Sequence, residues 1–336
     1  MSQPQSQLES GAVAAARAGD ESAFADLVEP HRRELQLHCY RMLGSLEDSE
    51  DLVQETFLRA WRKRESFEGR STFRAWLYKI ATNACLDALE RRPRVTPLQN
   101  GAQPLAETPW LQPYPDELLE GIAASDEEPE AEVVDKETIE LAFIAAIQLL
   151  PPKQRAVLIS RDVLGWSSAE SADLLGVSVA SVNSALQRAR ATMKRHLPRR
   201  RLDWAADSDP SREERELLQR YMDATEQGDA RAMVELLRAD ALCTMPPTPA
   251  WYVGADAIVE AWVQGGFGDD AWGHLRCVLT RTNKQPAVAC YVKRAGDSEY
   301  RPLALDVLRI EDGAFAEITA FPLEPLLDAL GLPRKL

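Results

Sequence analysis

Long apolar runs are absent from this chain of 336 residues. The longest apolar stretches, such as Leu141 to Ile147, fall far short of the roughly 20 residues that a membrane-spanning helix needs. The polar start at residues 1–10 has neither the basic nor the apolar region of a secretory signal. We therefore expect a cytoplasmic protein with no membrane partner.

Paired cysteines and metal-binding patterns are also missing. The five cysteines are scattered without a C-x-x-C pair, and only Cys277 has a histidine nearby in sequence, His274. We expect reduced, mostly buried thiols and no metal site. The sequence contains no phosphate-binding loop, nucleophile elbow or dinucleotide fingerprint, so we expect no cofactor.

Positive charge is scarce overall but concentrated in one place. The net charge of −14 by itself disfavours nucleic-acid binding, because phosphate neutralisation needs clustered lysine and arginine. Residues 93–136 hold 10 acidic and 2 basic side chains, whereas Leu186 to Arg201 holds seven Lys or Arg and no acid. This distribution is typical of a DNA-binding helix in an otherwise acidic protein.

Changes in composition divide the chain into four parts. Residues 15–92 have helical periodicity almost throughout and predict an all-α domain. Residues 93–136 are acidic and rich in proline, which indicates a linker. Residues 137–198 predict a second, short helical domain, and residues 211–331 predict an α+β domain with helices up to about Gly265. Its expected strands are Leu275–Thr280, Ala287–Lys293, Leu303–Ile310 and Ala314–Ala320.

The second helical domain contains the pattern of a helix-turn-helix. Ser167 and Glu170 predict a capping box, Gly176 suits a left-handed helix end, and Ser178 can cap the next helix. Periodicity places Val179, Val182, Leu186, Ala189 and Met193 on the buried face of that helix. The opposite face offers small side chains, amides and arginines, which suit the major groove; a surface helix with an arginine-rich end is the alternative.

The first domain has one unusual apolar residue. In a helix expected from Leu46 to Arg62, Leu58 lies in the middle of a polar stripe. A single exposed leucine is normally unremarkable, but one flanked by charge at helical spacing indicates a partner surface.

Two segments of the first domain resemble the sigma-70 family of transcription initiation factors. Asp48–Trp61, with the sequence Asp-Ser-Glu-Asp-Leu-Val-Gln-Glu-Thr-Phe-Leu-Arg-Ala-Trp, resembles that family's clamp-binding helix, and Phe67–Asp87 is similar to its promoter-melting loop and helix. The resemblance covers about residues 20–92 and 137–198. Because a linker alone joins the two modules, the chain resembles the extracytoplasmic-function group.

The resemblance implies partners and contacts. The chain would bind bacterial core RNA polymerase through the β′ clamp and β, and would read and melt promoter DNA. The implied polymerase contacts are Asp48, Asp51, Gln54, Glu55, Leu58 and Arg62. The implied minus-ten contacts are Arg64, Phe67, Arg70, Ser71, Thr72, Arg74, Lys79 and Asn83, with Phe73 and Trp76 expected in the core. The minus-thirty-five contacts would be Ser178, Ala180, Ser181, Ser184, Gln187, Arg188 and Arg195.

The linker carries a cluster of large apolar residues. Trp110, Leu111, Pro113 and Tyr114 stand in an otherwise polar segment, and such a cluster is disfavoured in water unless it docks. It resembles the Trp-Leu-Pro type motif of factors with a C-terminal extension, which implies contact with that extension. Incidental aromatic residues in a linker are the alternative.

The last domain resembles the SnoaL-like (nuclear transport factor 2-like) fold, a cone-shaped α+β domain. The fold implies helices at Glu216–Gly228 and Asp229–Arg238 and a third beginning at Trp251–Ile258. Residues that could line its pocket are Met245, Trp251, Trp262, Trp272, His274 and Tyr291. A catalytic acid/base pair would need His274 with Asp306 or Asp256, which is thin support for an enzyme.

The favoured function is therefore a non-catalytic sigma factor whose C-terminal domain contacts the two sigma modules and modulates them. The acidic linker and C-terminal domain could hold the basic helix electrostatically until polymerase displaces them. A helix-turn-helix regulator that responds to an unknown small ligand is one alternative. An isomerase or cyclase of SnoaL type, fused to a DNA-binding module, is another.

Overall fold

The computed structural model describes residues 11–69, 71–91, 108–120, 122, 138–197, 210–269 and 271–336. The chain forms two compact units. The helical unit contains the segments Met1–Pro97 and Glu117–Leu202, and the C-terminal unit contains Leu98–Asp116 and Asp203–Leu336. Among the described residues, every helix is too short or too polar to cross a bilayer.

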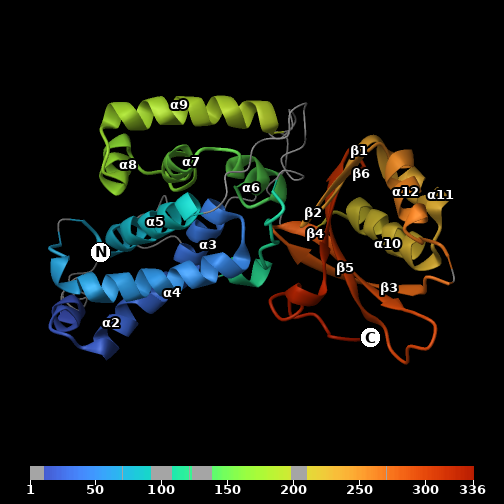
Figure 1. Ribbon diagram of the computed structural model, residues 1–336, viewed down its shortest axis with the longest axis horizontal. Helices are drawn as coiled ribbons and strands as arrows, with labels where there is room; N and C mark the ends of the chain where they lie inside the picture. The colour runs from blue at the N-terminus through green and yellow to red at the C-terminus, as the bar shows by residue number, and fades with distance from the viewer. Residues whose placement is uncertain are drawn as a thin grey trace. The chain divides into compact units, whose positions relative to one another are not determined.

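The helical unit contains two groups of helices. In the first group, α3, α4 and α5 pack together, and in the second, α7 and α8 pack against α9 (Figure 1). The helices are α2 (Glu21–Val28), α3 (Arg32–Leu43), α4 (Leu46–Lys63), α5 (Phe73–Arg91), α6 (Leu141–Gln148), α7 (Pro152–Leu158), α8 (Ser168–Leu175) and α9 (Val179–His196).

Local capping sets the helix-turn-helix, as the sequence predicts. The Ser167 hydroxyl accepts a hydrogen bond from the Glu170 N–H, and the Glu170 carboxylate accepts one from the Ser167 N–H. Gly176 ends α8 with a φ of 62°, a left-handed conformation that glycine adopts without steric cost. Ser178 then caps α9 by accepting from the Ser181 N–H. The start of α8, its end and the start of α9 thus each have a side-chain or glycine signal.

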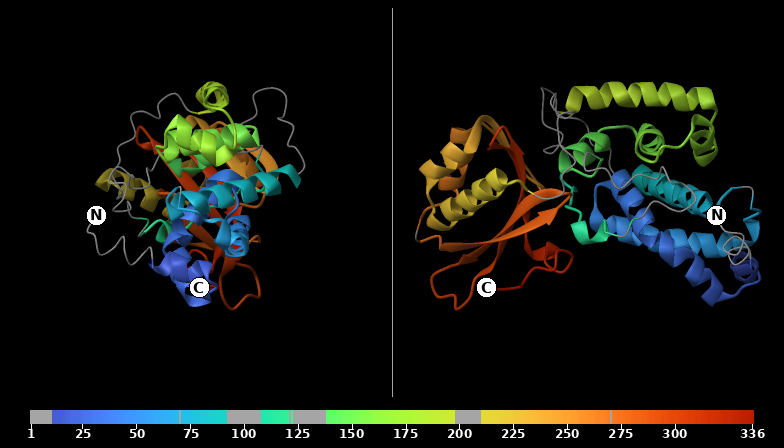
Figure 2. Two further views of the ribbon diagram at one scale, coloured as in Figure 1. Left: turned by 90° about the vertical axis from the view of Figure 1, so that its left-hand side faces the viewer. Right: turned by 180° about the vertical axis from the view of Figure 1, so that it is seen from behind.

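The C-terminal unit is a six-stranded sheet with helices on one face (Figure 2). The strand order is β2-β1-β6-β5-β4-β3, in which β1 and β6 are parallel and all other neighbours antiparallel. The elements are α10 (Arg212–Gln227), α11 (Ala230–Leu236), β1 (Leu237–Met245), β2 (Thr248–Val253), α12 (Ala255–Gln264), β3 (His274–Thr282), β4 (Gln285–Lys293), β5 (Arg301–Glu311) and β6 (Ala314–Pro322).

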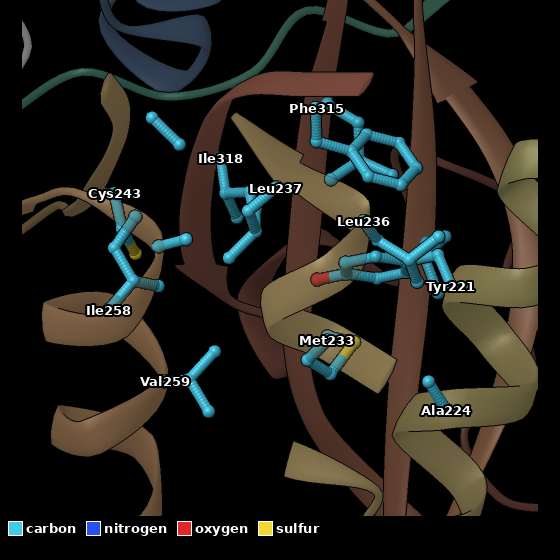
Figure 3. Close-up of a cluster of buried hydrophobic side chains, with 14 of the residues drawn as sticks. Tyr221, Ala224, Met233, Leu236, Leu237, Cys243, Ile258, Val259, Phe315 and Ile318 are labelled. Carbon is cyan, nitrogen blue, oxygen red and sulfur yellow. The ribbon is translucent and has the colours of Figure 1, made fainter. Parts of the chain in front are cut away.

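The core of this unit lies between the three helices and one sheet face. Figure 3 shows side chains of α10, α11 and α12 directed toward those of the sheet. The Tyr221 and Phe315 rings meet edge to face with centroids 5.0 Å apart. We call this side of the sheet the inner face; Cys243, Val288, Cys290 and Leu308 belong to it.

Strands β3 to β6 confirm the four expected strands, but two further strands were missed. The expectation of helix as far as Arg238, and of a helix beginning at Trp251, is wrong: α11 ends at Leu236, and β1 and β2 precede α12. The physical reason is that β1 pairs from Leu237 onward with β6 and further along with β2, and such long-range pairing leaves no local signal. The short exposed strand β2 has little apolar alternation to reveal it.

Candidate functional site

Helix α4 presents the expected polar stripe with an exposed leucine. Leu58 is 52% exposed, an unusually high fraction for a large apolar side chain in this protein. Asp51, Gln54 and Arg62 are also exposed, while Asp48 and Glu55 are partly so. The opposite side of α4 is anchored by buried Val53, Thr56 and Ala60. The stripe is therefore a rigid surface.

The loop between α4 and α5 surrounds an aromatic cluster. Phe67 is buried and its ring contacts those of Phe73 and Trp76, with centroids 5.5 and 5.2 Å away. Arg64 lies with its guanidinium 4.2 Å from the Trp61 ring centre. Phe67, a candidate minus-ten contact, is thus a core residue of this loop in the described state, together with Phe73, whereas Trp76 packs against them and is partly exposed.

A buried polar network holds Arg74. The Arg74 Nε donates to Glu34 Oε2 at 2.7 Å, the Tyr78 hydroxyl donates to the same oxygen at 3.2 Å, and His31 Nδ1 lies 2.5 Å from Glu34 Oε1. Burial opposes ionisation of Glu34, but His31 and Arg74 together hold the pKa of that carboxyl below its ordinary value. Arg74 therefore ties α5 to α3 instead of standing in solvent.

The remaining minus-ten candidates differ in their surroundings. Ser71, Thr72 and Asn83 are exposed, and Thr72 also accepts from the Ala75 N–H at the start of α5. Lys79 pairs with Asp173 of α8, its Nζ 3.1 Å from the Asp173 Oδ2. Arg70 lies outside the described residues.

Helix α9 exposes every residue proposed to read the upstream element. Ser178, Ala180, Ser181, Ser184, Gln187, Arg188 and Arg195 are all exposed. Val182, Leu186, Ala189 and Met193 are buried as expected. Val179 was expected on the buried face, and this is wrong: it is 44% exposed, because it lies in the first turn beside exposed Ser178 and Ala180.

The helix-turn-helix module packs on the first helical group. Arg155 of α7 is 4% exposed and donates to the backbone carbonyls of Gln148, Leu150 and Met42, the last of these at the end of α3. Gln148 in turn donates to the Arg41 carbonyl at 3.1 Å. The Tyr78 and Trp166 rings meet edge to face at 5.4 Å. Together with the Lys79–Asp173 pair, these contacts hold the two groups together.

The linker motif docks on the tip of the β3–β4 hairpin. The Tyr114 N–H donates to Asn283 Oδ1 at 2.7 Å, and the Tyr114 carbonyl accepts from the Asn283 N–H at 2.9 Å and the Thr282 hydroxyl at 2.7 Å. Asp116 accepts from the Lys284 N–H at 2.8 Å. Leu111 and Tyr114 are buried, Trp110 half-buried, and Pro113 buried.

The hairpin tip has the geometry that this docking needs. Asn283 and Lys284 form a two-residue loop with φ of 55° and 58°, a type I′ arrangement that usually selects glycine at its second position. A lysine there is strained, by on the order of 1 kcal/mol. Asp116 accepts the amide of this residue, so linker docking and the hairpin conformation support each other.

The candidate pocket residues do not form one lining. Met245 and Trp262 border the inner core. The pairing register turns Trp251, His274 and Tyr291 to the opposite face of the sheet, because each alternates with inner-face residues; Trp272 lies in the loop before β3. Asp306 pairs with Val288 on the inner face, so His274 and Asp306 lie on opposite faces, and Asp256 is exposed on α12.

Asp306 was named from the sequence as a possible acid/base partner of His274, but its partners on the inner face, Tyr221 and Cys290, were missed. Asp306 Oδ2 accepts from the Tyr221 hydroxyl at 3.0 Å and lies 3.6 Å from the Cys290 sulfur. Burial raises the pKa of Asp306 to about 6, although these two hydrogen bonds oppose the shift. The sequence signal for the burial of Asp306 is its inward position in the apolar strand segment Leu303–Leu308.

Three family models match the chain. Sigma-70 region 2 matches residues 27–95, Sigma-70 region 4 matches residues 140–193, and the SnoaL-like domain matches residues 218–318. These ranges contain α3 to α5, α6 to most of α9, and most of the C-terminal sheet.

Curated relatives extend the match to nearly the whole chain. The ECF RNA polymerase sigma factor SigG of Mycobacterium tuberculosis is 44% identical over 331 residues, which cover 95% of this chain and 86% of the relative. SigW of Bacillus subtilis is 31% identical over 179 residues, covering 53% of this chain and 91% of the relative. The crystal structure of the M. tuberculosis extracytoplasmic-function sigma factor SigJ shares the fold, with a TM-score of 0.58, 23% identity and coverage of 92% of this chain and 100% of SigJ. The chain belongs to the extracytoplasmic-function (ECF) RNA polymerase sigma factors and carries a SnoaL-like C-terminal domain.

Proposed function

We propose that this sigma factor uses the α4 stripe to bind core polymerase, the α4–α5 loop and α5 to read and melt the minus-ten element, and α9 to read the minus-thirty-five element. Leu58 is the observation that carries the proposal. A half-exposed leucine within a charged stripe is disfavoured in water and is stabilised when a partner covers it. Core polymerase and promoter DNA lie in the bacterial cytoplasm, so this function places the chain there.

The upstream contact rests on the outward face of α9. Gln187 and Arg188 can reach base edges, Ala180 and exposed Val179 allow close approach and apolar contact with thymine methyl groups, and Arg195 suits phosphate. The downstream contact rests on Ser71 and Thr72, which are exposed just before Phe73, and on Asn83, which is exposed further along α5.

The described helical unit is proposed to be a closed state. Elements named for positions −10 and −35 are about 25 base pairs apart, or about 85 Å at 3.4 Å per base pair. Two helical groups joined by Arg155, Lys79 and Trp166 contacts cannot span that distance. Polymerase binding must therefore separate them, which also releases Lys79 from Asp173 for contact with DNA.

The C-terminal domain is proposed to regulate the sigma modules without catalysis of its own. It holds the linker through Tyr114 and Asp116, so it controls the path of the segment that joins the two modules. The acid/base pair that an isomerase would need is not assembled by His274 and Asp306, which face opposite sides of the sheet. A small ligand on the inner face, at Asp306, would be a means of changing this control.

Reconstituted transcription tests the proposal. The purified chain and core polymerase should together yield a promoter-specific transcript, and neither should do so alone. A chain that ends at Leu202, without most of the C-terminal unit, should change transcript yield, because the linker loses its docking partner. No transcript, together with tight promoter binding by the chain alone, would favour the ligand-responsive regulator. Equal yield from both chains would contradict the regulatory role.

A further inference from the structure

Two cysteines face each other across the β3–β4 hairpin. Cys277 and Cys290 are register partners in a continuous antiparallel ladder, and their sulfur atoms lie 4.0 Å apart. Cys290 is buried on the inner face, whereas Cys277 is partly exposed on β3, the last strand of the sheet. The two thiols are therefore held in contact by the sheet and do not depend on chance encounter.

The ladder places this pair at a site where a disulfide can form. Thr282 and Gln285 close the two-residue loop, and hydrogen-bonded and non-hydrogen-bonded pairs alternate from there, which makes Cys277–Cys290 a non-hydrogen-bonded pair. The Cys277 N–H supports this, because it points away from β4 and donates to Glu226 Oε1 at 2.9 Å. Cα atoms in such pairs are about 4.5 Å apart, within the roughly 4.4–6.8 Å range of disulfides. Side-chain rotation is then sufficient to join the sulfurs.

We propose that Cys277 and Cys290 form an oxidisable dithiol that closes to a disulfide when the protein meets a hydroperoxide. Disulfides in a reducing cytoplasm are typically transient and redox-sensing, which fits a partly exposed pair in a transcription factor. The inference does not depend on the proposed promoter contacts.

The chemistry needs one peroxide per disulfide. The Cys277 thiolate attacks hydrogen peroxide, the O–O bond breaks, and the sulfur becomes a sulfenic acid while the departing hydroxide takes up a proton as the first water. The Cys290 thiol then passes its proton to Asp306, 3.6 Å away, and attacks the Cys277 sulfur. The S–S bond forms, the S–O bond breaks, and the departing hydroxide takes up a proton as the second water.

The two cysteines have distinct parts in this sequence. Cys277 has the access that peroxide needs. The hydrogen bond with Cys277, burial and the nearby Asp306 carboxyl all raise the pKa of the Cys290 thiol, so Cys290 needs a base before it can attack. Asp306 is that base, because its carboxylate lies beside Cys290 and receives a further hydrogen bond from Tyr221.

Oxidation has a consequence for the linker. The same hairpin carries Thr282, Asn283 and Lys284 at its tip, which hold Tyr114 and Asp116. A covalent bond across β3 and β4 restricts the relative motion of the two strands, so the oxidised hairpin releases the linker less readily.

Mass spectrometry of the full chain tests the dithiol. After hydrogen peroxide treatment and alkylation, a nonreducing digest should contain the Cys277 and Cys290 peptides joined, with the bond reversed by dithiothreitol. Cys243→Ser is the control and should leave the bond intact. In Cys290→Ser, a dimedone adduct should accumulate at Cys277, and a circular dichroism spectrum like that of the wild type shows that the variant folds. Alkylatable Cys290 beside an overoxidised Cys277, or a bond to any other cysteine, would overturn the proposal.

Two further measurements test the role of Asp306 and the effect on the linker separately. Asp306→Asn should slow disulfide closure roughly tenfold or more while sulfenic acid forms at the wild-type rate; equal closure rates would remove Asp306 from the chemistry. Hydrogen exchange of the Tyr114 amide should differ between the reduced and oxidised chains. Identical exchange would overturn the link to the linker and leave the dithiol in place.

Discussion

His38 is a buried, neutral histidine in the core of the helical unit. Its Nε2 lies 2.9 Å from the Thr82 hydroxyl oxygen and its ring meets that of Tyr78 edge to face. Burial, together with Arg41, lowers its pKa to about 3. In the unfolded chain the ordinary value of about 6.5 applies, so between pH 6.5 and 3 the unfolded state binds the additional proton.

We therefore predict that the contribution of neutral His38 to the stability of the helical unit is fully present above about pH 6.5 and is lost as the pH falls toward 3. The loss from His38 is on the order of 4 kcal/mol. Urea unfolding followed by helical circular dichroism, at several pH values, measures it. His38→Asn should flatten the dependence over this range; an equally steep dependence in the variant would assign acid sensitivity to other groups, such as Glu34.

Asp306 lowers the stability of the C-terminal unit as the pH rises, which is the opposite of the effect of His38. Its pKa of about 6 in the folded state exceeds the ordinary value near 3.8, so the folded state holds the proton longer as the pH rises. Stability contributed by protonated Asp306 is present below pH 4 and falls by about 3 kcal/mol between pH 4 and 6. Asp306→Asn should remove this fall. The measurement is unfolding of the C-terminal unit at several pH values, followed by near-ultraviolet circular dichroism of its tryptophans. Equal pH dependence of stability in the wild type and Asp306→Asn would contradict the assignment of this fall to Asp306.

Helix α9 offers a matched pair of arginines. Arg188 is exposed on the outward face and donates only locally, to Ser184 at 2.7 Å among its described contacts, whereas Arg190 forms a two-point ion pair with Asp162. We predict that Arg188→Ala weakens specific binding to the upstream element about tenfold, the effect of losing one good base contact. Arg190→Ala should leave sequence preference unchanged. Fluorescence anisotropy with matched and scrambled promoter fragments checks this, and an equal loss on both fragments for Arg188→Ala would make it a phosphate contact.

The elements that were predicted correctly from the sequence are those with local signals. Ser167, Glu170, Gly176 and Ser178 act within a few residues, so the helix-turn-helix was read correctly. Strands β1 and β2 were missed because β2 is short and largely exposed. The pairs Arg74–Glu34 and Lys79–Asp173 join residues 40 and 94 positions apart, and no periodicity reports such contacts. Candidate DNA contacts were thus named without knowledge that the protein itself engages two of them.

At the scale of the C-terminal unit, the linker is held at the tip of the β3–β4 hairpin. Asn283 is fully buried and both donates to and accepts from the Tyr114 backbone. Asn283→Ala leaves a buried N–H without its acceptor, which costs about 1–3 kcal/mol, so the linker should undock. We expect faster chymotryptic cleavage after Trp110, in the same linker motif, and altered transcript yield. His274→Ala, at the far end of the same hairpin, should resemble the wild type; unchanged cleavage in Asn283→Ala would show that the linker is held elsewhere.

At the scale of the whole molecule, the chain is proposed to act as a subunit of RNA polymerase that docks through α4. The direct measurement is the affinity of the full chain for core polymerase, compared with Leu58→Asp and with Val179→Asp as a control of equal chemistry on α9. We predict a loss of about tenfold or more for Leu58→Asp, since a charge replaces an apolar contact that polymerase buries, and wild-type affinity for Val179→Asp. Undiminished binding by Leu58→Asp would contradict the assignment of the α4 stripe as the polymerase-binding surface.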